Sequence, residues 1–153
     1  MKQDQIIRFG TGGWRGIIGD DFIKANVERV AYAVCRLARE EGKADKPIVI
    51  GYDRRFLSEV SSRWIASVLA AQGIGAILVN RSTPTPLIMF LVQDMELHYG
   101  IEVTASHNPA SYNGIKLIVE GAESAEPEVV PGDVTGDGKV TVKDATEIYK
   151  MFK

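Results

Sequence analysis

The sequence predicts an α/β fold, a three-layer α/β/α domain in which a largely parallel (mixed) sheet lies between helices. Segments with apolar residues three and four positions apart recur along the chain, and short apolar runs rich in β-branched residues follow them. The two kinds of segment alternate over residues 22–119. Such alternation is typical of strands joined by helical crossovers, which place a parallel sheet between helical layers.

The first expected helix occupies residues 22–41 and buries one face. Asp20 or Asp21 can cap its start, and Gly42 can end it. Residues 47–52 then form a continuous apolar run, which predicts a strand that is covered on both faces.

A second helix is expected to begin with Ser58 as its N-cap and to end at Gly73, before a strand at 76–79. Residues 83–86 contain two prolines and predict an extended turn, after which 87–97 form a third helix. The last expected elements are two strands, 100–104 and 115–119.

Composition and charge exclude several classes of protein. The 153 residues carry 18 basic and 20 acidic side chains without a basic stripe, so nucleic acid is not an expected partner. No apolar stretch is long enough to span a bilayer, and the N-terminus lacks the apolar core of a secretory signal. We therefore expect no membrane contact and a cytoplasmic location. The single cysteine, Cys35, excludes a disulfide framework and is expected to be buried in the first helix.

The composition changes near Ala122, which predicts three parts. Residues 1–122 form the α/β/α domain, and residues 123–131, with two prolines and three glutamates, form a linker. Residues 132–153 form a separate module with its own turn-rich pattern.

The segment 104–109 reads Thr-Ala-Ser-His-Asn-Pro and directly follows a predicted buried strand. Loops at the carboxyl ends of strands are where open α/β sheets bind ligands, so Ser106 is a candidate nucleophile. The flanking pairs Asn108-Pro109 and Asn113-Gly114 are turn formers that would expose its hydroxyl. Alternatively, Ser106 and Asn108 only close a turn by hydrogen bonds to their own backbone.

Four ordered stretches carry a family resemblance. They are Phe-Gly-Thr-Gly-Gly-Trp-Arg-Gly at 9–16, Ile-Gly-Tyr-Asp-Arg at 50–54, Thr-Ala-Ser-His-Asn-Pro at 104–109 and Asn-Gly-Ile-Lys at 113–116. With these stretches the chain resembles the first domain of the α-D-phosphohexomutases, the family of phosphoglucomutase and phosphomannomutase.

The resemblance implies that Ser106 carries a phosphoryl group, which it gives to a hexose monophosphate and regains from the bisphosphorylated sugar. It also implies that the phosphoserine is a ligand of Mg²⁺. Arg15 and Lys116 match positions that hold phosphoryl oxygens, as cationic side chains do. His107 either assists proton movement or only orients the loop.

Further positions follow from the same resemblance. Thr11 and Gly12 are expected to bring backbone N–H groups close to phosphate, although a tight turn explains the glycine equally well. Arg54 and Asn108 are the remaining expected substrate-binding residues. A complete family enzyme has three more domains, which supply a metal loop, sugar contacts and a phosphate site, so we expect this chain alone to be inactive as a mutase.

The residues after 131 carry a second motif. Counting from Asp133, oxygen ligands fall where an EF-hand-type loop places them, with Gly138 in the sixth position for the sharp turn. These calcium ligands are Asp133, Thr135, Asp137, the Lys139 carbonyl, Thr141 and Asp144. The alternative is a solvated acidic turn.

The tail resembles one dockerin repeat, the calcium-dependent module that binds cohesin. Dockerins normally carry two repeats, so a single repeat argues against cohesin binding, and the missing secretory signal disfavours a cellulosomal location outside the cell. The following helix presents Ile148, Tyr149 and Phe152 on one side. We expect it to pack on the α/β domain, a second copy or another chain. A calcium-dependent interaction module on an inert scaffold is thus the alternative function.

Overall fold

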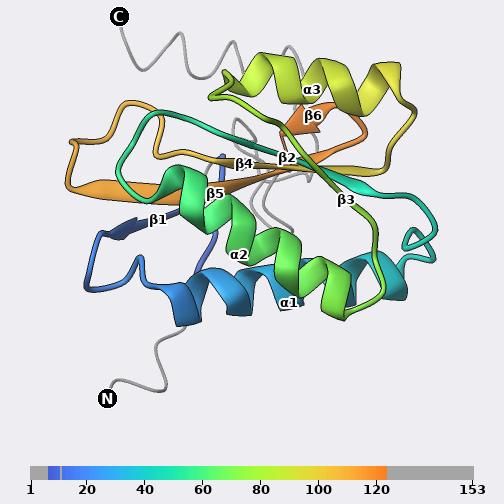
Figure 1. Ribbon diagram of the computed structural model, residues 1–153, viewed down its shortest axis with the longest axis horizontal. Coiled ribbons are helices and arrows are strands. Elements are labelled where there is room, and N and C mark those ends of the chain that lie inside the picture. The colour runs from blue at the N-terminus through green and yellow to red at the C-terminus, as the bar shows by residue number, and fades with distance from the viewer. Residues whose placement is uncertain (1–6, 11, 124–153) are drawn as a thin grey trace, which may run out of the picture.

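A computed structural model describes residues 7–10 and 12–123, which fold into three layers (Figure 1). Helix α3 covers one face of a central sheet, and α1 and α2 lie side by side on the other face. The described elements are, in chain order, β1 (Trp14–Ile17), α1 (Lys24–Glu40), β2 (Ile48–Tyr52), α2 (Ser58–Ala71), β3 (Ala76–Leu78), α3 (Thr85–Asp94), β4 (Tyr99–Val103), β5 (Tyr112–Val119) and β6 (Ala122–Glu123). No helix among them is long and apolar enough to cross a membrane.

The sheet is mixed, with strand order β1-β5-β4-β2-β3 and β6 paired to β5. β2 runs parallel to both β3 and β4, whereas β5 runs antiparallel to β4, β1 and β6. The predicted mixed sheet between helices is thereby confirmed, and its parallel half carries the helical crossovers.

Two apolar clusters hold the layers together. The larger one lies between the sheet and α1 and α2, and includes Trp14, Phe22 and the buried Cys35. The smaller one lies under α3 and contains Ile88 and Val92. Cys35 is thus the buried small hydrophobe that was expected, and burial raises the pKa of its thiol.

The predicted helix starts differ from the structure. α1 has Ile23 as its N-cap, without a side-chain cap hydrogen bond, so the assignment of Asp20 or Asp21 as cap is wrong. α2 has Leu57 at the N-cap in a left-handed conformation, and the Ser58 hydroxyl instead donates to Asp53. A tertiary contact at the end of β2 thus takes the serine that a local pattern assigns to capping.

The Asn113-Gly114 pair does not form a turn, as the sequence suggested, but lies inside β5. β1, which pairs with β5 there, was not expected. Their close approach explains the glycine: a side chain on Gly114 would overlap the Trp14 carbonyl oxygen of β1. Glu123, the first residue of the predicted linker, pairs with β5 in β6, whereas the rest of the linker and the calcium loop, with all six of its ligands, lie outside the described residues.

Candidate functional site

Ser106 lies on the loop between β4 and β5, at the carboxyl end of β4, and is exposed. Its φ is +53°, in the left-handed region that a residue with a side chain adopts only when its surroundings hold it there. The turn is closed by the Asn108 N–H, which donates to the Ala105 carbonyl at 3.0 Å, and by the Ser106 N–H, which donates to the Thr104 hydroxyl at 3.0 Å. Backbone groups and Thr104 therefore shape the loop and leave the Ser106 side chain at the surface.

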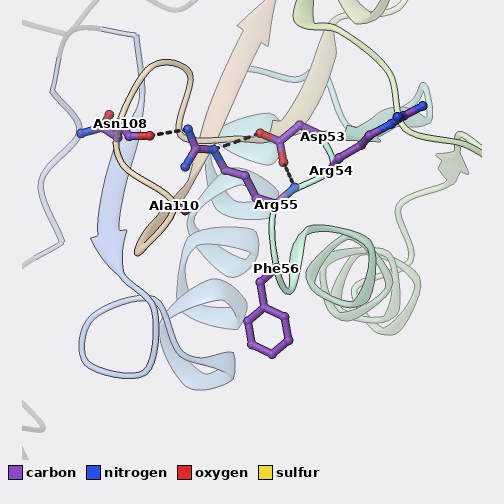
Figure 2. Close-up of a pocket in the computed structure, with 6 residues that line it drawn as sticks. All are labelled: Asp53, Arg54, Arg55, Phe56, Asn108 and Ala110. Atoms are coloured by element: carbon purple, nitrogen blue, oxygen red, sulfur yellow. Dashed lines mark hydrogen bonds and ion pairs between the residues drawn. The ribbon is translucent and has the colours of Figure 1, made fainter.

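Arg55, just after β2, fastens this loop from one side (Figure 2). Its guanidinium donates to the carbonyl oxygens of Ser106 at 2.8 Å and Asn108 at 2.6 Å. It also donates to the carbonyl oxygens of Pro109 at 2.8 Å and Tyr112 at 3.1 Å. One side chain thus binds the backbone of the serine loop along most of its length, which sequence reasoning missed.

Asp53 anchors both Arg55 and the start of the loop. Its carboxylate accepts hydrogen bonds from the Ser58 hydroxyl at 2.7 Å, the Arg55 N–H at 2.8 Å and the Thr104 hydroxyl at 2.7 Å. The Arg55 Nε lies 3.3 Å from the same carboxylate. Since Thr104 accepts from Ser106, a continuous chain of hydrogen bonds leads from the end of β2 to the serine.

Asn113 ties β5 into the same network. Its side-chain amide donates to the Phe56 carbonyl at 2.9 Å and to the Ser58 hydroxyl at 2.8 Å, while its oxygen accepts the Gly114 N–H at 2.8 Å. The side chain is fully buried. Its role is therefore to join β5 to the loop before α2, not to form the turn that the sequence suggested.

The two expected phosphate-binding cations lie on one face of the sheet. Arg15 is opposite Gly114 in the β1–β5 pair, and Lys116 is opposite Glu102 in the β4–β5 pair. Opposed residues in antiparallel strands share a face, and alternate residues of β5 do as well. Arg15 and Lys116 therefore both point to the α3 side of the sheet, next to the end of β4 that leads into Ser106. Arg15 also donates to the Gly12 carbonyl at 3.1 Å.

Glu102 is a further charged residue on this face, and sequence reasoning missed it. It is fully buried between Lys116 on β5 and the α3 layer. Burial, together with the negative charge of Asp53, raises its pKa to about 8, although Lys116 acts in the opposite direction. The sequence did show a carboxyl group in the middle of a buried strand, which is the pattern by which it could have been found.

The other predicted site residues are less closely gathered. His107 is exposed beside Ser106, Gly12 has a φ of +72°, and Thr11 lies outside the described residues. An open pocket of about 510 Å³ is lined by Arg54, Asn108 and their neighbours Asp53, Arg55, Phe56 and Ala110. Figure 2 shows Arg54 pointing away from the serine loop, where its Nε donates to the Ser82 hydroxyl at 3.3 Å.

The described residues do not by themselves form a magnesium site. They contain no group of three or more His, Cys, Asp or Glu side chains arranged to hold a metal ion. Mg²⁺ requires a near-octahedral set of oxygen ligands, and the carboxylate nearest the loop, Asp53, already accepts hydrogen bonds from three residues.

Comparisons with known proteins identify the family of this domain. Residues 7–131 match the family model for phosphoglucomutase/phosphomannomutase, alpha/beta/alpha domain I. A phosphoglucomutase from Staphylococcus saprophyticus is 38% identical over 125 residues, covering 80% of this chain and 23% of that protein. A phosphoglucosamine mutase from Thermobifida fusca is 33% identical over 123 residues, covering 79% of this chain and 27% of that protein.

The fold is also shared with solved structures. A crystal structure from Thermus thermophilus, described as a phosphomannomutase, has a TM-score of 0.74 and 38% identity, over 78% of this chain and 27% of that one. The chain thus spans about a quarter of the length of the relatives it matches. The family match covers most of the 153 residues and extends beyond Ala122, where the sequence predicted the domain to end. The chain therefore belongs to the phosphoglucomutase/phosphomannomutase family and carries its α/β/α domain I.

Proposed function

We propose that Ser106 is the residue of a phosphohexomutase that carries the phosphoryl group, and that residues 1–122 are the domain that presents it. The observation that carries this proposal is the exposed serine on a loop whose backbone is bound by Arg55 at four carbonyl oxygens. A held loop fixes the position of the hydroxyl oxygen, and phosphoryl transfer depends mainly on positioning and charge stabilisation.

In this proposal Ser106 Oγ attacks a phosphorus atom of a hexose bisphosphate. The new bond joins Oγ to phosphorus, the bond from phosphorus to the sugar oxygen breaks, and the serine proton passes to that oxygen. Arg15 and Lys116 would balance the charge of the phosphoryl oxygens from the same face of the sheet. His107 is exposed next to Ser106 and is proposed to assist the proton transfer or to orient the loop.

Substrate binding and turnover extend beyond the described residues. Gly12, Thr11, Arg54 and Asn108 are proposed to contribute to substrate binding, and a phosphorylated Ser106 is proposed to contribute one oxygen ligand to Mg²⁺. When bound, Mg²⁺ would neutralise phosphoryl charge. We propose that this chain carries the phosphoryl group and that complete mutase turnover requires an enzyme that contains further domains.

The test is to incubate the chain with radiolabelled glucose 1,6-bisphosphate and Mg²⁺ and to map the labelled peptide. We expect one phosphoryl group on Ser106 and no label in Ser106→Ala, because that variant lacks the nucleophile. Ser111→Ala is the matched control, since Ser111 is an exposed serine on the same loop, and it should be labelled normally. A folded wild-type chain that stays unlabelled, or equal labelling of Ser106→Ala, would contradict the proposal.

We also propose that residues 132–153 bind Ca²⁺, because Asp133, Asp137 and Asp144 have calcium-loop spacing. In this second proposal residues 123–131 are a linker and the tail is an interaction module. Calorimetric titration with Ca²⁺ should give heat for the wild-type chain and much less for Asp133→Ala. Equal heat from the two proteins, or none from either, would rule the calcium site out.

A further inference from the structure

Glu102 occupies a place in β4 that an apolar side chain normally fills. Its neighbours Ile101 and Val103 pack into the core on the opposite face, and Glu102 itself has no exposed surface. Neither of its carboxyl oxygens has a hydrogen-bond partner among the described residues. Buried polar groups without partners destabilise a fold, and such groups are concentrated at functional sites.

Among the described residues, one positive and one negative group act on the charge of Glu102. Lys116, which is only 8% exposed, lies directly opposite on β5, and Asp53 follows β2 on the other side. Gly51 of β2 leaves the space that the carboxyl occupies, because a side chain there would overlap Glu102 Oε2. From α3 the neighbour is the apolar Ile88, which also lies over Gly51, and the one titratable residue of α3 is the exposed Asp94 at its far end.

This environment keeps a proton on the carboxyl at neutral pH. Asp53 is already committed to Arg55 and Thr104, and its negative charge opposes the ionisation of Glu102. Lys116 favours ionisation. The protonation state of Glu102 therefore determines whether Lys116 faces a neutral carboxyl group or a carboxylate.

A phosphoryl group on Ser106 would also affect the Lys116 ammonium and the ionisation of Glu102. It adds a charge of about −1.5 to −2 at neutral pH, which attracts Lys116 and repels an ionised Glu102. By linkage, two events that favour each other must do so reciprocally. Phosphorylation of the serine and protonation of the buried carboxyl should therefore be coupled.

We propose that Glu102 is a positioning residue for Lys116. While the Glu102 carboxyl is protonated, the Lys116 ammonium binds the phosphoryl group on Ser106. When the Glu102 carboxyl is ionised, it holds the ammonium back. The inference rests on the function proposed above. It predicts that, at about pH 8 and above, where Glu102 is partly or largely ionised, the chain binds a proton as Ser106 becomes phosphorylated.

The first experiment compares the rate of Ser106 labelling by glucose 1,6-bisphosphate at pH 7 and pH 9. For a carboxyl that titrates near pH 8, the protonated fraction falls from about nine-tenths to about one-tenth over this range. We expect the wild-type rate to fall by up to about tenfold, and Glu102→Gln, whose amide stays neutral, to lose most of that fall. Glu40→Gln, which changes an exposed glutamate of α1, should behave as wild type. A Glu102→Gln profile that falls in parallel with wild type would overturn the inference while leaving the proposed function intact.

The second experiment does not depend on phosphorylation or on the stability of Glu102→Gln. Carbon-13 NMR of labelled glutamate carboxyls follows the Glu102 titration in the wild-type chain, in Lys116→Met and in the control Lys43→Met. Removing the Lys116 ammonium should raise the pKa of Glu102 further, whereas removing the Lys43 ammonium should leave it unchanged. A Glu102 that titrates in the ordinary range of a glutamate, or that does not respond to Lys116→Met, would refute the coupling even if Ser106 is labelled.

Discussion

Arg55 holds the serine loop by its backbone, because the partners of Arg55 in the loop are main-chain carbonyl oxygens and not side chains. A guanidinium presents five N–H donors in a planar fork, which suits it to bind several acceptors at once. The carbonyl groups that it binds belong to four residues, Ser106, Asn108, Pro109 and Tyr112. The left-handed conformation of Ser106, with its φ of +53°, is kept in place by these contacts and by Thr104.

Replacing Arg55 with lysine should therefore separate the effect of its positive charge from the effect of its hydrogen-bond geometry. Arg55→Lys retains a positive charge beside Asp53 but cannot donate to all four carbonyl groups. We expect Ser106 labelling to fall about tenfold or more, and the free energy of unfolding to drop by about 1–3 kcal/mol. Urea denaturation and the labelling assay measure the two effects. Arg36→Lys, at an exposed arginine of α1, is the matched control, and an equal loss in both variants would show that the fork geometry of Arg55 does not hold the loop.

The adjacent arginines Arg54 and Arg55 also show what the sequence cannot predict about single side chains. The sequence places Asp53, Arg54 and Arg55 directly after the apolar strand predicted at 47–52. It does not predict which arginine turns toward the serine loop, because that depends on the local turn in which the Arg55 N–H donates to Asp53 Oδ1 at 2.8 Å. The residue that reaches the loop is Arg55, whereas the family resemblance implied Arg54 as a substrate-binding residue.

At the scale of elements, the close contact of β1 with β5 depends on Gly114. A Cβ at this position would overlap the Trp14 carbonyl oxygen and lie 2.9 Å from the Thr104 carbonyl oxygen. Both atoms belong to the backbone of paired segments, so neither can move without breaking the sheet. Since Arg15 lies on β1, the same contact also places one of the two cations.

Gly114→Ala should therefore destabilise the domain by about 2–3 kcal/mol, as overpacking of a filled site does. Gly73→Ala is an informative control, because Gly73 has a φ of +72° but a Cβ there would meet nothing within 4 Å. It should cost about 1 kcal/mol, from backbone strain alone. Denaturant unfolding of the two variants compares them, and a Gly114→Ala protein as stable as Gly73→Ala would mean that β1 can shift without cost.

The elements that were predicted correctly are those with strong periodicity. The three helices have apolar residues at helical spacing, the buried strands β2 and β4 are short runs rich in β-branched residues, and β3 was found between its flanking helices. β1 was missed because four residues containing a glycine carry no usable period. The Asn113-Gly114 pair misled the sequence reading, since these residues favour turns locally and the pairing of β5 with both β1 and β4 overrides that preference.

At the scale of the whole molecule, the site is built at one end of the sheet by residues from strands that are distant in sequence. Asp53 and Arg55 follow the end of β2, Ser106 follows the end of β4, and β5 contributes Lys116. The apolar clusters on both faces fix the positions of the strands, so the charged side chains of the site are held close together. Because Glu102 is buried away from water, its ionisation should lower the free energy of unfolding of the entire domain.

The free energy of unfolding should accordingly depend on pH through Glu102. Its pKa is about 8 in the folded chain and near 4.5 in an unfolded one, so between these values the folded state keeps a proton that the unfolded state has lost. Stability must then fall as pH rises from about 4.5 to about 8, by up to about 4 kcal/mol for a shift of this size. The hydrogen bond from the Tyr99 hydroxyl lowers the pKa of Glu41, which acts in a different window, below 4.5, where stability falls as the pH decreases.

Urea unfolding at pH 5, 6.5 and 8 measures this dependence in the wild-type chain and in Glu102→Gln. We expect the wild-type free energy of unfolding to decrease over the series, and the decrease to be largely absent in the variant, because its amide does not ionise in either state. The pH responses of the two proteins should therefore differ most between about pH 5 and about pH 7.5, where the folded wild-type chain keeps a proton that the unfolded chain has lost. If both proteins lose stability in parallel, the decrease arises from other groups, and Glu102 ionises in the folded chain as readily as in the unfolded one.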